Sequence, residues 1–152
     1  IQIGIAVVIH NGHYLVGKRQ IQQTLSGYWE FPGGKCHTNE PPQHCAEREC
    51  LEETGLTVMA DCLRYQTVHH YTHGPVHLHF FNCTLSSHEV EPRPPFRWID
   101  IEGLRHLTFP EANRKLAEEV SGSGVLISEF SIAMAANFSR RNRVISDLRH
   151  AC

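Results

Sequence analysis

The chain has 152 residues, of which 41% are hydrophobic and 20% charged, and its formal net charge is -2. This length suits one domain with a sizeable core, and the near balance of charge excludes the broad basic field typical of proteins that bind nucleic acid or anionic membranes. No apolar run approaches the ~20 residues that cross a bilayer, and the amino terminus lacks the pattern of a secretory signal. The sequence begins with Ile1 and not with Met, which leaves open that residues precede it.

The six cysteines form no C-x-x-C pair and no dense framework, so a reduced, cytoplasmic setting is the simplest interpretation. Five of the 12 histidines fall within residues 69–79. Either a zinc or nickel site or a set of solvated, pocket-lining side chains would explain them. No fourfold ligand set of the usual spacing is present, which favours the second explanation.

Strands are predicted over most of the first 35 residues. Residues 1–10 are rich in β-branched side chains, and an Asn-Gly pair at 11–12 separates them from the apolar run at 14–19. This arrangement is a strong signal for a hairpin. A third strand is predicted at 26–35, with a break at the Pro-Gly-Gly segment 32–34.

A helix is predicted from Pro41 to Thr54. Proline suits the first helical turn, where its missing amide hydrogen is not needed, and Gly55 suits a left-handed stop. Three more strands and a second helix follow, at residues 56–71, 75–85, 96–101 and 110–120. This order of elements predicts a mixed α/β domain.

We expect the domain to span residues 1–120. The Ser-Gly-Ser-Gly segment at 121–124 is typical of a linker, and residues 121–152 are predicted to be a linker and a C-terminal tail of unknown role. Apolar side chains at Ile127, Phe130 and Met134 would let the tail pack as a helix or mediate self-association. A poorly ordered appendage is the alternative.

Three glutamates of the first predicted helix, Glu49, Glu52 and Glu53, share one side. Residues three and four apart are neighbours on a helix, and each like-charge pair costs roughly a few tenths of a kcal/mol. A solvated acidic face is the commoner use of such residues. However, small Cys45 and Ala46 lie on the same side, as expected where another group approaches closely. Clustered carboxylate oxygens suit Mg²⁺ or Mn²⁺, whose charge would turn repulsion into attraction.

The segment GKCHTNEPPQHCAERECLEETGL resembles the Nudix box, the signature G-x5-E-x7-R-E-U-x-E-E-x-G-U in which U is bulky and aliphatic. All seven fixed positions are filled, by Gly34, Glu40, Arg48, Glu49, Glu52, Glu53 and Gly55. Leu56 fits the final apolar position. Cys50 departs from the usual Leu, Ile or Val, but cysteine packs as a small hydrophobe, so we expect a slightly looser helix contact rather than lost chemistry.

The resemblance implies a Nudix-type α/β/α sandwich with a mixed sheet, in which the box forms a loop-helix-loop. It also implies hydrolysis of a nucleoside diphosphate linked to another group, with Mg²⁺ or Mn²⁺ as cofactor. Glu49, Glu52 and Glu53 would hold the metal, helped by the Gly33 carbonyl. Glu40 would be either a ligand through water or a residue that fixes the loop.

The resemblance gives two further catalytic expectations. Glu49 or Glu53 would take the proton from the attacking water. Arg48, which a helical wheel directs away from the carboxylates, would form an ion pair that orients a glutamate.

Within the family, the chain looks most like the MutT-type branch, which removes oxidised purine nucleoside triphosphates from the nucleotide pool and so avoids mutation. The segments VGKR, WEFPGGK, RWIDIEGL and FPEANRKL occur in that branch's order. The resemblance implies that Arg19 touches phosphate or base, that Phe31 lines the base pocket and that Asn113 hydrogen-bonds the purine. The expected substrate is 8-oxo-dGTP. Phe31 as plain core and Asn113 as a surface residue are the alternatives.

Several alternatives stay open at this level. Members of the branch often have another acidic metal ligand in the loop before the strand that is predicted here at 96–101. Glu89 or Glu91 would serve in this chain. Another nucleoside diphosphate derivative is the alternative substrate: CTP or dCTP, a dinucleoside polyphosphate or a nucleotide sugar. A non-catalytic nucleotide sensor is the alternative of another class. We expect a nucleoside triphosphate as the partner, no nucleic acid polymer and no membrane, and a monomer or homodimer.

Overall fold

The computed structural model of the chain describes residues 1–20, 26–72, 74–86, 88–110, 113 and 116. The elements, in chain order, are β1 (Gln2–His10), β2 (His13–Lys18), β3 (Trp29–Glu30), β4 (Gly33–Lys35), α1 (Pro42–Thr54), β5 (Val58–Tyr71), β6 (Gly74–Leu85), β7 (Phe96–Asp100) and α2 (Ile101–Arg105). None of the helices in the described ranges is long and apolar enough to cross a membrane.

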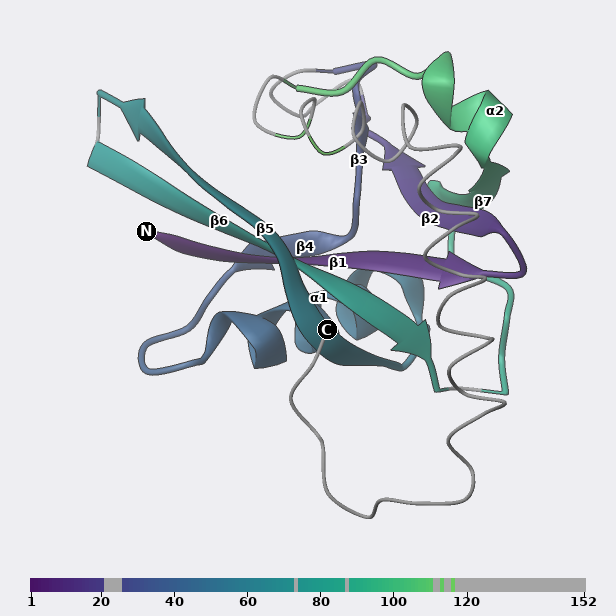
Figure 1. Cartoon of the computed structure of the whole chain (residues 1–152), viewed down its shortest axis with the longest axis horizontal. Helices are drawn as coiled ribbons and strands as arrows, with labels where there is room; N and C mark the ends of the chain where they lie inside the picture. Colours follow the sequence, from purple (N-terminus) through teal and green to yellow (C-terminus); the bar gives the residue numbers. More distant parts are fainter. Residues whose placement is uncertain (21–25, 73, 87, 111–112, 114–115, 117–152) are drawn as a thin grey trace, which may run out of the picture.

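The strands form a mixed sheet, as predicted. The order is β3-β2-β1-β6-β5, with β4 also paired to β1 and β7 to β2. Strand β1 runs parallel to β6 and antiparallel to β2 and β4. The long strands β5 and β6 form an antiparallel hairpin on one side of β1 (Figure 1). Strand β1 therefore holds the centre of the fold and touches the loop that enters α1.

The first predicted hairpin is confirmed. Asn11 and Gly12 adopt φ values of 49° and 75°, and Ile9 faces Tyr14 across the two-residue turn. The predicted third strand is broken, but at Phe31 and Pro32, because Gly33 and Gly34, expected in the break, belong to β4. The break changes the pairing partner. Strand β3 pairs with β2, whereas β4, beyond Pro32, pairs with β1. The Pro32 carbonyl accepts a 2.8 Å hydrogen bond from the Ala6 amide at this crossing point.

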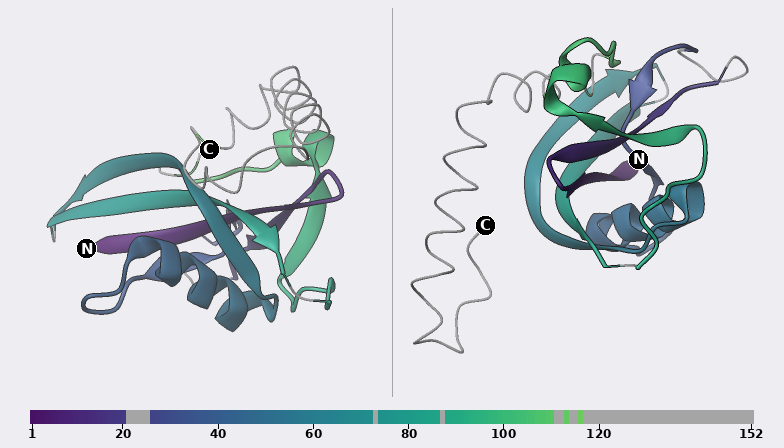
Figure 2. Two further views of the ribbon diagram at one scale, coloured as in Figure 1. Left: turned by 60° about the horizontal axis from the view of Figure 1, so that its bottom comes forward. Right: turned by 90° about the vertical axis from the view of Figure 1, so that its right-hand side faces the viewer.

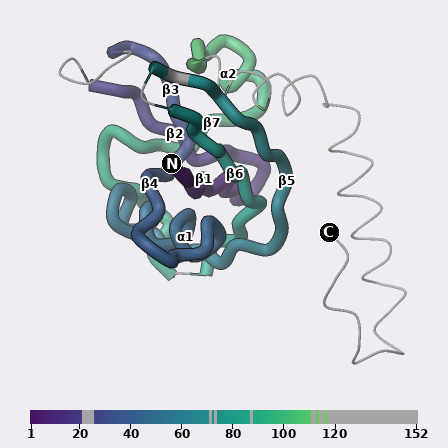
Figure 3. The backbone as a smooth tube through the Cα atoms, turned by 90° about the vertical axis from the view of Figure 1, so that its left-hand side faces the viewer, coloured from purple at the N-terminus to yellow at the C-terminus, as the bar shows by residue number. Residues whose placement is uncertain are grey.

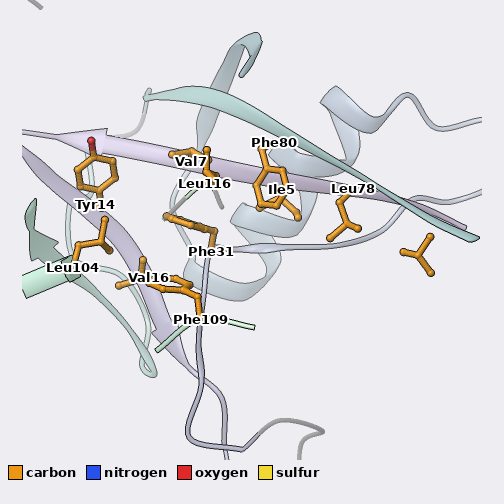
Figure 4. Close-up of a cluster of buried hydrophobic side chains, with 11 residues drawn as sticks. Ile5, Val7, Tyr14, Val16, Phe31, Leu78, Phe80, Leu104, Phe109 and Leu116 are labelled. Carbon is orange, nitrogen blue, oxygen red and sulfur yellow. The ribbon is translucent and has the colours of Figure 1, made fainter. Parts of the chain in front are cut away.

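Both faces of the central strands are buried, because successive side chains of a strand point to opposite faces. The first core cluster takes alternate residues of β1 and β2 and residues from later segments, including Ile5, Val7, Val16, Phe31, Leu104, Phe109 and Leu116 (Figure 4). The second core cluster takes the intervening residues and the inner face of α1, including Ala6, Val8, Leu15, Ala46 and Cys50. Helices α1 and α2 thus lie on opposite sides of the strands (Figures 2 and 3).

Close approach of α1 to β1 depends on Gly4. A Cβ atom at this position would lie 2.7 Å from the Ala46 amide nitrogen and 2.9 Å from the Cys45 Cβ, and would overlap the Pro42 carbonyl oxygen. Two of these three atoms belong to the helix backbone, which cannot move away alone. Glycine at this position therefore sets the depth at which the first turn of α1 sits on the sheet.

The predicted boundaries of α1 are correct to one residue. The helix starts at Pro42 with Pro41 as its N-cap. Gly55 ends it with φ 77°, and the Gly55 amide donates a hydrogen bond to the Leu51 carbonyl. Helix α2 was not predicted, although Asp100 is a standard cap whose side chain accepts a bond from the Gly103 amide. Of the second predicted helix, Pro110 is not helical, Asn113 and Leu116 are helical, and the other residues lie outside the described ranges, as does the 121–152 tail.

Candidate active site

The guanidinium of Arg48 lies at the centre of a carboxylate cluster. Its Nε donates to Glu40 Oε1 at 2.8 Å, its Nη2 to Glu40 Oε2 at 2.9 Å, and its Nη1 to Glu49 Oε1 at 2.7 Å and Glu52 Oε2 at 3.3 Å. The expected ion pair with a glutamate is therefore present. The expectation that Arg48 points away from the carboxylates is wrong, because its long side chain folds back over the face that a helical wheel assigns from the Cα position alone.

Glu40 closes the loop between β4 and α1. Besides the two bonds from Arg48, its Oε2 accepts a 2.8 Å bond from the His37 amide. The hydrogen bonds from Arg48, followed by the one from His37, lower the pKa of Glu40 to about 2. Of the two predicted roles for Glu40, these contacts support the one that fixes the loop.

Glu53 is the box glutamate that is tied to the sheet. Its Oε2 accepts a 3.0 Å hydrogen bond from the Gly33 amide at the start of β4. Burial, followed by the Glu30 and Glu49 carboxylates, raises the pKa of Glu53, and the Gly33 amide and Arg19 oppose the rise, so that the pKa is about 7. This half-buried carboxyl therefore exchanges its proton near neutral pH.

Gly34 packs directly on the Glu49 carboxylate. A Cβ atom at Gly34 would lie 2.7 Å from Glu49 Oε1 and closer still to the rest of the carboxylate. The Gly34 carbonyl accepts a 3.3 Å bond from the Cys45 thiol, which ties the loop to the first turn of α1. Gly34 therefore gives the Glu49 carboxylate space against the backbone of β4.

The fourth glutamate of the helix has a different role. Glu47 Oε1 accepts a 2.8 Å bond from the Ala60 amide, and Gln43 Nε2 donates at 2.7 Å to the Ala60 carbonyl. Both backbone groups of Ala60 are held at the point where the pairing of β5 with β6 shifts register. Glu47 is therefore a structural clamp between α1 and β5.

Charge in the cluster favours a divalent cation. Glu40, Glu49 and Glu52 surround the single guanidinium of Arg48, and half-buried Glu53 lies on the same helix, so negative charge exceeds positive charge there. Carboxylate oxygens are the donors that Mg²⁺ and Mn²⁺ prefer, so the residues present fit such an ion. Among the described residues, however, the one group of three possible ligands whose donor atoms lie within 4.8 Å of one another is Cys36, Glu40 and Cys45. In this structure Glu49 and Glu52 contact Arg48, and Glu53 contacts Gly33.

The residues expected to bind substrate come from three segments. Arg19, just after β2, forms a 2.6 Å ion pair with Glu30. Phe31 is 3% exposed and stacks on Phe109 with ring centroids 5.3 Å apart, so its ring belongs to the core in this structure. Asn113 is partly buried, and its backbone amide donates a hydrogen bond to the carbonyl of Pro110, the residue after Phe109. The segment that carries Asn113 thus lies beside Phe31, while a contact of either residue with a base stays a prediction.

Sequence reasoning missed Glu30. Burial raises the pKa of this carboxyl against the opposing effect of Arg19, and its charge in turn raises the pKa of Glu53. The alternation of side chains along a strand was the available signal, since it places Glu30 on the side opposite its apolar neighbours Trp29 and Phe31.

The loop before β7 lies beside the end of α1. The Arg93 amide donates to the Thr54 carbonyl at 2.8 Å, and Arg93 Nη1 to the Glu52 carbonyl at 3.4 Å. Glu89 and Glu91 are exposed on this loop, and Glu89 Oε1 accepts a bond from the Glu91 amide. The loop therefore contacts the end of the box helix through Arg93, and the role of Glu89 or Glu91 as an extra metal ligand stays a prediction.

The histidine segment lies on the β5–β6 hairpin. His79 Nε2 lies 2.7 Å from Gln2 Oε1, and burial followed by the neighbouring His77 lowers the pKa of His79. Within the described ranges, none of these histidines joins a group of three close metal ligands, and His73 lies outside those ranges.

Comparison with known proteins matches both the fold and the box. A family model described as the NUDIX domain matches residues 4–119. The chain is 32% identical over 90 residues to an 8-oxo-dGTP diphosphatase of Proteus vulgaris, covering 59% of this chain and 80% of that protein. It is 26% identical over 120 residues to an 8-oxo-dGTP diphosphatase of Buchnera aphidicola, covering 78% of this chain and 91% of that protein.

Other similar proteins differ in name. An RNA pyrophosphohydrolase of Bartonella quintana is 25% identical over 154 residues, covering 80% of this chain and 89% of that protein. Among solved structures, the DNA mismatch repair protein MutT of methicillin-resistant Staphylococcus aureus superposes with a TM-score of 0.66 at 27% identity, covering 82% of this chain and 97% of that chain.

Proposed function

This chain belongs to the NUDIX domain family, and from that premise we propose that it is a metal-dependent pyrophosphohydrolase that converts 8-oxo-dGTP to its monophosphate and pyrophosphate. The observation that carries the proposal is the complete acidic set of the box, held against the β4 backbone through Gly33 and Glu53. The relatives named 8-oxo-dGTP diphosphatase, matched over most of their length, support the choice of substrate.

Two groups of residues have different proposed roles, positioning and metal binding. Arg48 and Glu40 fix the loop and hold Glu49 and Glu52 in place through ion pairs of 2.7–3.3 Å. Glu49, Glu52 and Glu53, with the Gly33 carbonyl, are proposed to hold Mg²⁺ or Mn²⁺. Such a cation would neutralise phosphate charge and lower the pKa of a bound water molecule.

Glu53 is the better candidate for the general base. In the metal-free chain burial raises the pKa of Glu53 to about 7, and a bound cation would lower it. Its Oε2 is held by the Gly33 amide, which leaves Oε1 to accept a proton from attacking water. Glu49, the other candidate, is already paired with the permanently charged Arg48.

Recognition of the base is proposed to fall to Arg19, Phe31 and Asn113. Oxidation of guanine at C8 converts N7 from a hydrogen-bond acceptor into a donor. An asparagine amide offers an acceptor and a donor together, so Asn113 can read this reversal beside O6. A partner left unpaired in a buried site costs ~1–3 kcal/mol, which is the physical basis for rejecting dGTP.

The test is a substrate panel with Mg²⁺, scored by kcat/KM for 8-oxo-dGTP, dGTP, dCTP, a dinucleoside polyphosphate and RNA with a 5′-triphosphate. We expect 8-oxo-dGTP to be preferred over dGTP by ~10²-fold or more. In the Asn113→Ala variant this preference should shrink more than turnover at saturating substrate falls. A panel led by dCTP or by RNA would refute the substrate while leaving the hydrolase assignment in place.

RNA with a 5′-triphosphate is the second candidate, because relatives named RNA pyrophosphohydrolase also match most of the chain. A non-catalytic sensor is the rival of another class. Binding of 8-oxo-dGTP without release of pyrophosphate at any Mg²⁺ or Mn²⁺ concentration would favour that sensor.

A further inference from the structure

Two cysteines lie side by side at the entrance to α1. Cys36 directly follows β4, Cys45 lies in the first turns of α1, and their sulfur atoms are within 4.8 Å of each other. Both backbones are anchored. The Cys36 amide donates to the Gln2 carbonyl at 2.9 Å, and the Cys45 amide to the Pro41 carbonyl at 3.0 Å. The short separation therefore accompanies a loop held to β1 and a first helical turn held by its own backbone.

A metal ion is a poor occupant for this pair, even though Glu40 completes a group of three possible ligands. Both oxygens of Glu40 already accept hydrogen bonds, from Arg48 and from the His37 amide. The Arg48 guanidinium also lies 3.6 Å from the Cys45 sulfur. Burial raises the pKa of the Cys45 thiol to about 12, so Cys45 is the less reactive thiol of the pair.

We propose that Cys36 and Cys45 form a reversible disulfide that is made by peroxide and lowers turnover at the neighbouring carboxylate cluster. Cys36 is partly exposed and Cys45 is fully buried, so an oxidant meets Cys36 first. A disulfide needs the two sulfur atoms ~2.05 Å apart, so the side chains and the loop that carries Cys36 must close the remaining distance.

The reaction balances in two steps. A peroxide transfers one oxygen to the Cys36 thiol, giving a sulfenic acid, and hydrogen peroxide leaves as water. The Cys45 sulfur then attacks the Cys36 sulfur and displaces hydroxide. This hydroxide takes the Cys45 proton and leaves as a second water. A dithiol such as dithiothreitol returns both thiols by exchange.

The effect on turnover rests on the proposed function. The reduced Cys45 thiol donates to the Gly34 carbonyl, and Gly34 packs on the Glu49 carboxylate. Oxidation removes that donated hydrogen and draws Cys36 toward the Cys45 sulfur beneath Arg48, so the loop from Cys36 to Glu40 shifts against Arg48. Displacement of positioned groups by ~1 Å costs up to ~10²-fold in rate.

The experiment uses the full chain, reduced and then treated with graded hydrogen peroxide. Free thiols are alkylated, the protein is digested with trypsin, and the peptides are identified by mass spectrometry. Cys36 and Cys45 lie together between Lys35 and Arg48, so we expect one peptide that carries both cysteines unalkylated and is lighter than its reduced form by the mass of two hydrogen atoms. We also expect a fall in kcat of at least ~10-fold, and dithiothreitol should reverse both changes. Cys36→Ser should keep its activity and lose its sensitivity to peroxide. Cys62→Ser, which removes another partly buried thiol, should form the same link as the unaltered chain.

Three results would overturn the proposal: Cys36 oxidised to the sulfinic acid without a bond to Cys45, Cys36 joined to a different cysteine, or a fully linked protein with unchanged turnover. Failure of the proposed function is distinguishable. A reduced chain without hydrolytic activity would refute that function, and the peptide analysis would still decide whether the two cysteines bond.

Discussion

The Gly33 amide donates a 3.0 Å hydrogen bond to Oε2 of Glu53, a residue 20 positions further along the chain. This contact joins the strand before the box to the last turn of its helix, and it places a carboxyl group in a partly desolvated position. Because burial there raises the pKa of Glu53 to about 7, the protonation of this one residue would link stability to the proposed metal site.

In metal-free protein, we expect stability to fall as pH rises toward neutrality. The folded chain holds a proton on Glu53 up to a pKa of about 7, against an ordinary value of 4.5, so it binds more protons than the unfolded chain between these values. The stabilisation is full below pH 4.5 and is lost as pH rises through 7, on the order of 2 kcal/mol. Thermal unfolding in EDTA from pH 4.5 to 8 measures it. Glu53→Gln, which cannot ionise, should show a flatter profile, and an equal slope in both proteins would contradict this assignment.

Gly34→Ala and Gly4→Ala form a matched pair that separates activity from folding. At Gly34 the added methyl group meets the mobile end of Glu49, so we expect the carboxylate to move, kcat to fall by ~10²-fold and the Tm to change little. At Gly4 it meets backbone atoms of α1, so we expect a loss of ~1–3 kcal/mol in stability. Equal effects of the two substitutions on Tm would show that Gly34 serves packing alone.

Glu49→Gln keeps the side-chain shape and removes one charge from the cluster around Arg48. We expect kcat to fall by at least ~10²-fold with the fold intact, as when a catalytic or electrostatic group is lost. In the unaltered chain, Mg²⁺ or Mn²⁺ should raise the Tm, because an ion that binds only the folded state stabilises it. Adding Glu52→Gln should abolish most of that rise. Near-normal turnover by the double variant would remove these residues from the mechanism.

Cys50 tests whether the unusual residue in the box serves packing. It is fully buried in the second core cluster, where its sulfur lies 3.7 Å from Thr54 Oγ1, and burial raises the pKa of its thiol to about 11. Cys50→Val should therefore hold or raise the Tm and keep kcat within a few-fold, since volume-conserving apolar substitutions usually cost under ~1.5 kcal/mol. A folded but inactive variant would reveal a function of the thiol.

Local sequence patterns were sufficient for most elements of the fold and for the box glutamates, but not for α2 or for Glu30. The turn at Asn11 and Gly12, the start of α1 and its stop at Gly55 depend on backbone preferences of single residues, which act the same way in any surroundings. The spacing of Glu49, Glu52 and Glu53 follows from the helical repeat alone. These features could be read before any contact was known.

The partners of those residues were decided by tertiary structure. The sequence does not show that β4 leaves β3 to pair with β1, and that pairing is what brings the Gly33 amide to Glu53 and Gly34 to Glu49. The sequence also did not show where the guanidinium of Arg48 lies. The long side chain of Arg48 reaches carboxylates on both the loop and the helix. The physical reason is range: turn and helix preferences act over a few residues, whereas hydrogen bonds, burial and the pKa of Glu53 depend on groups that only folding brings together.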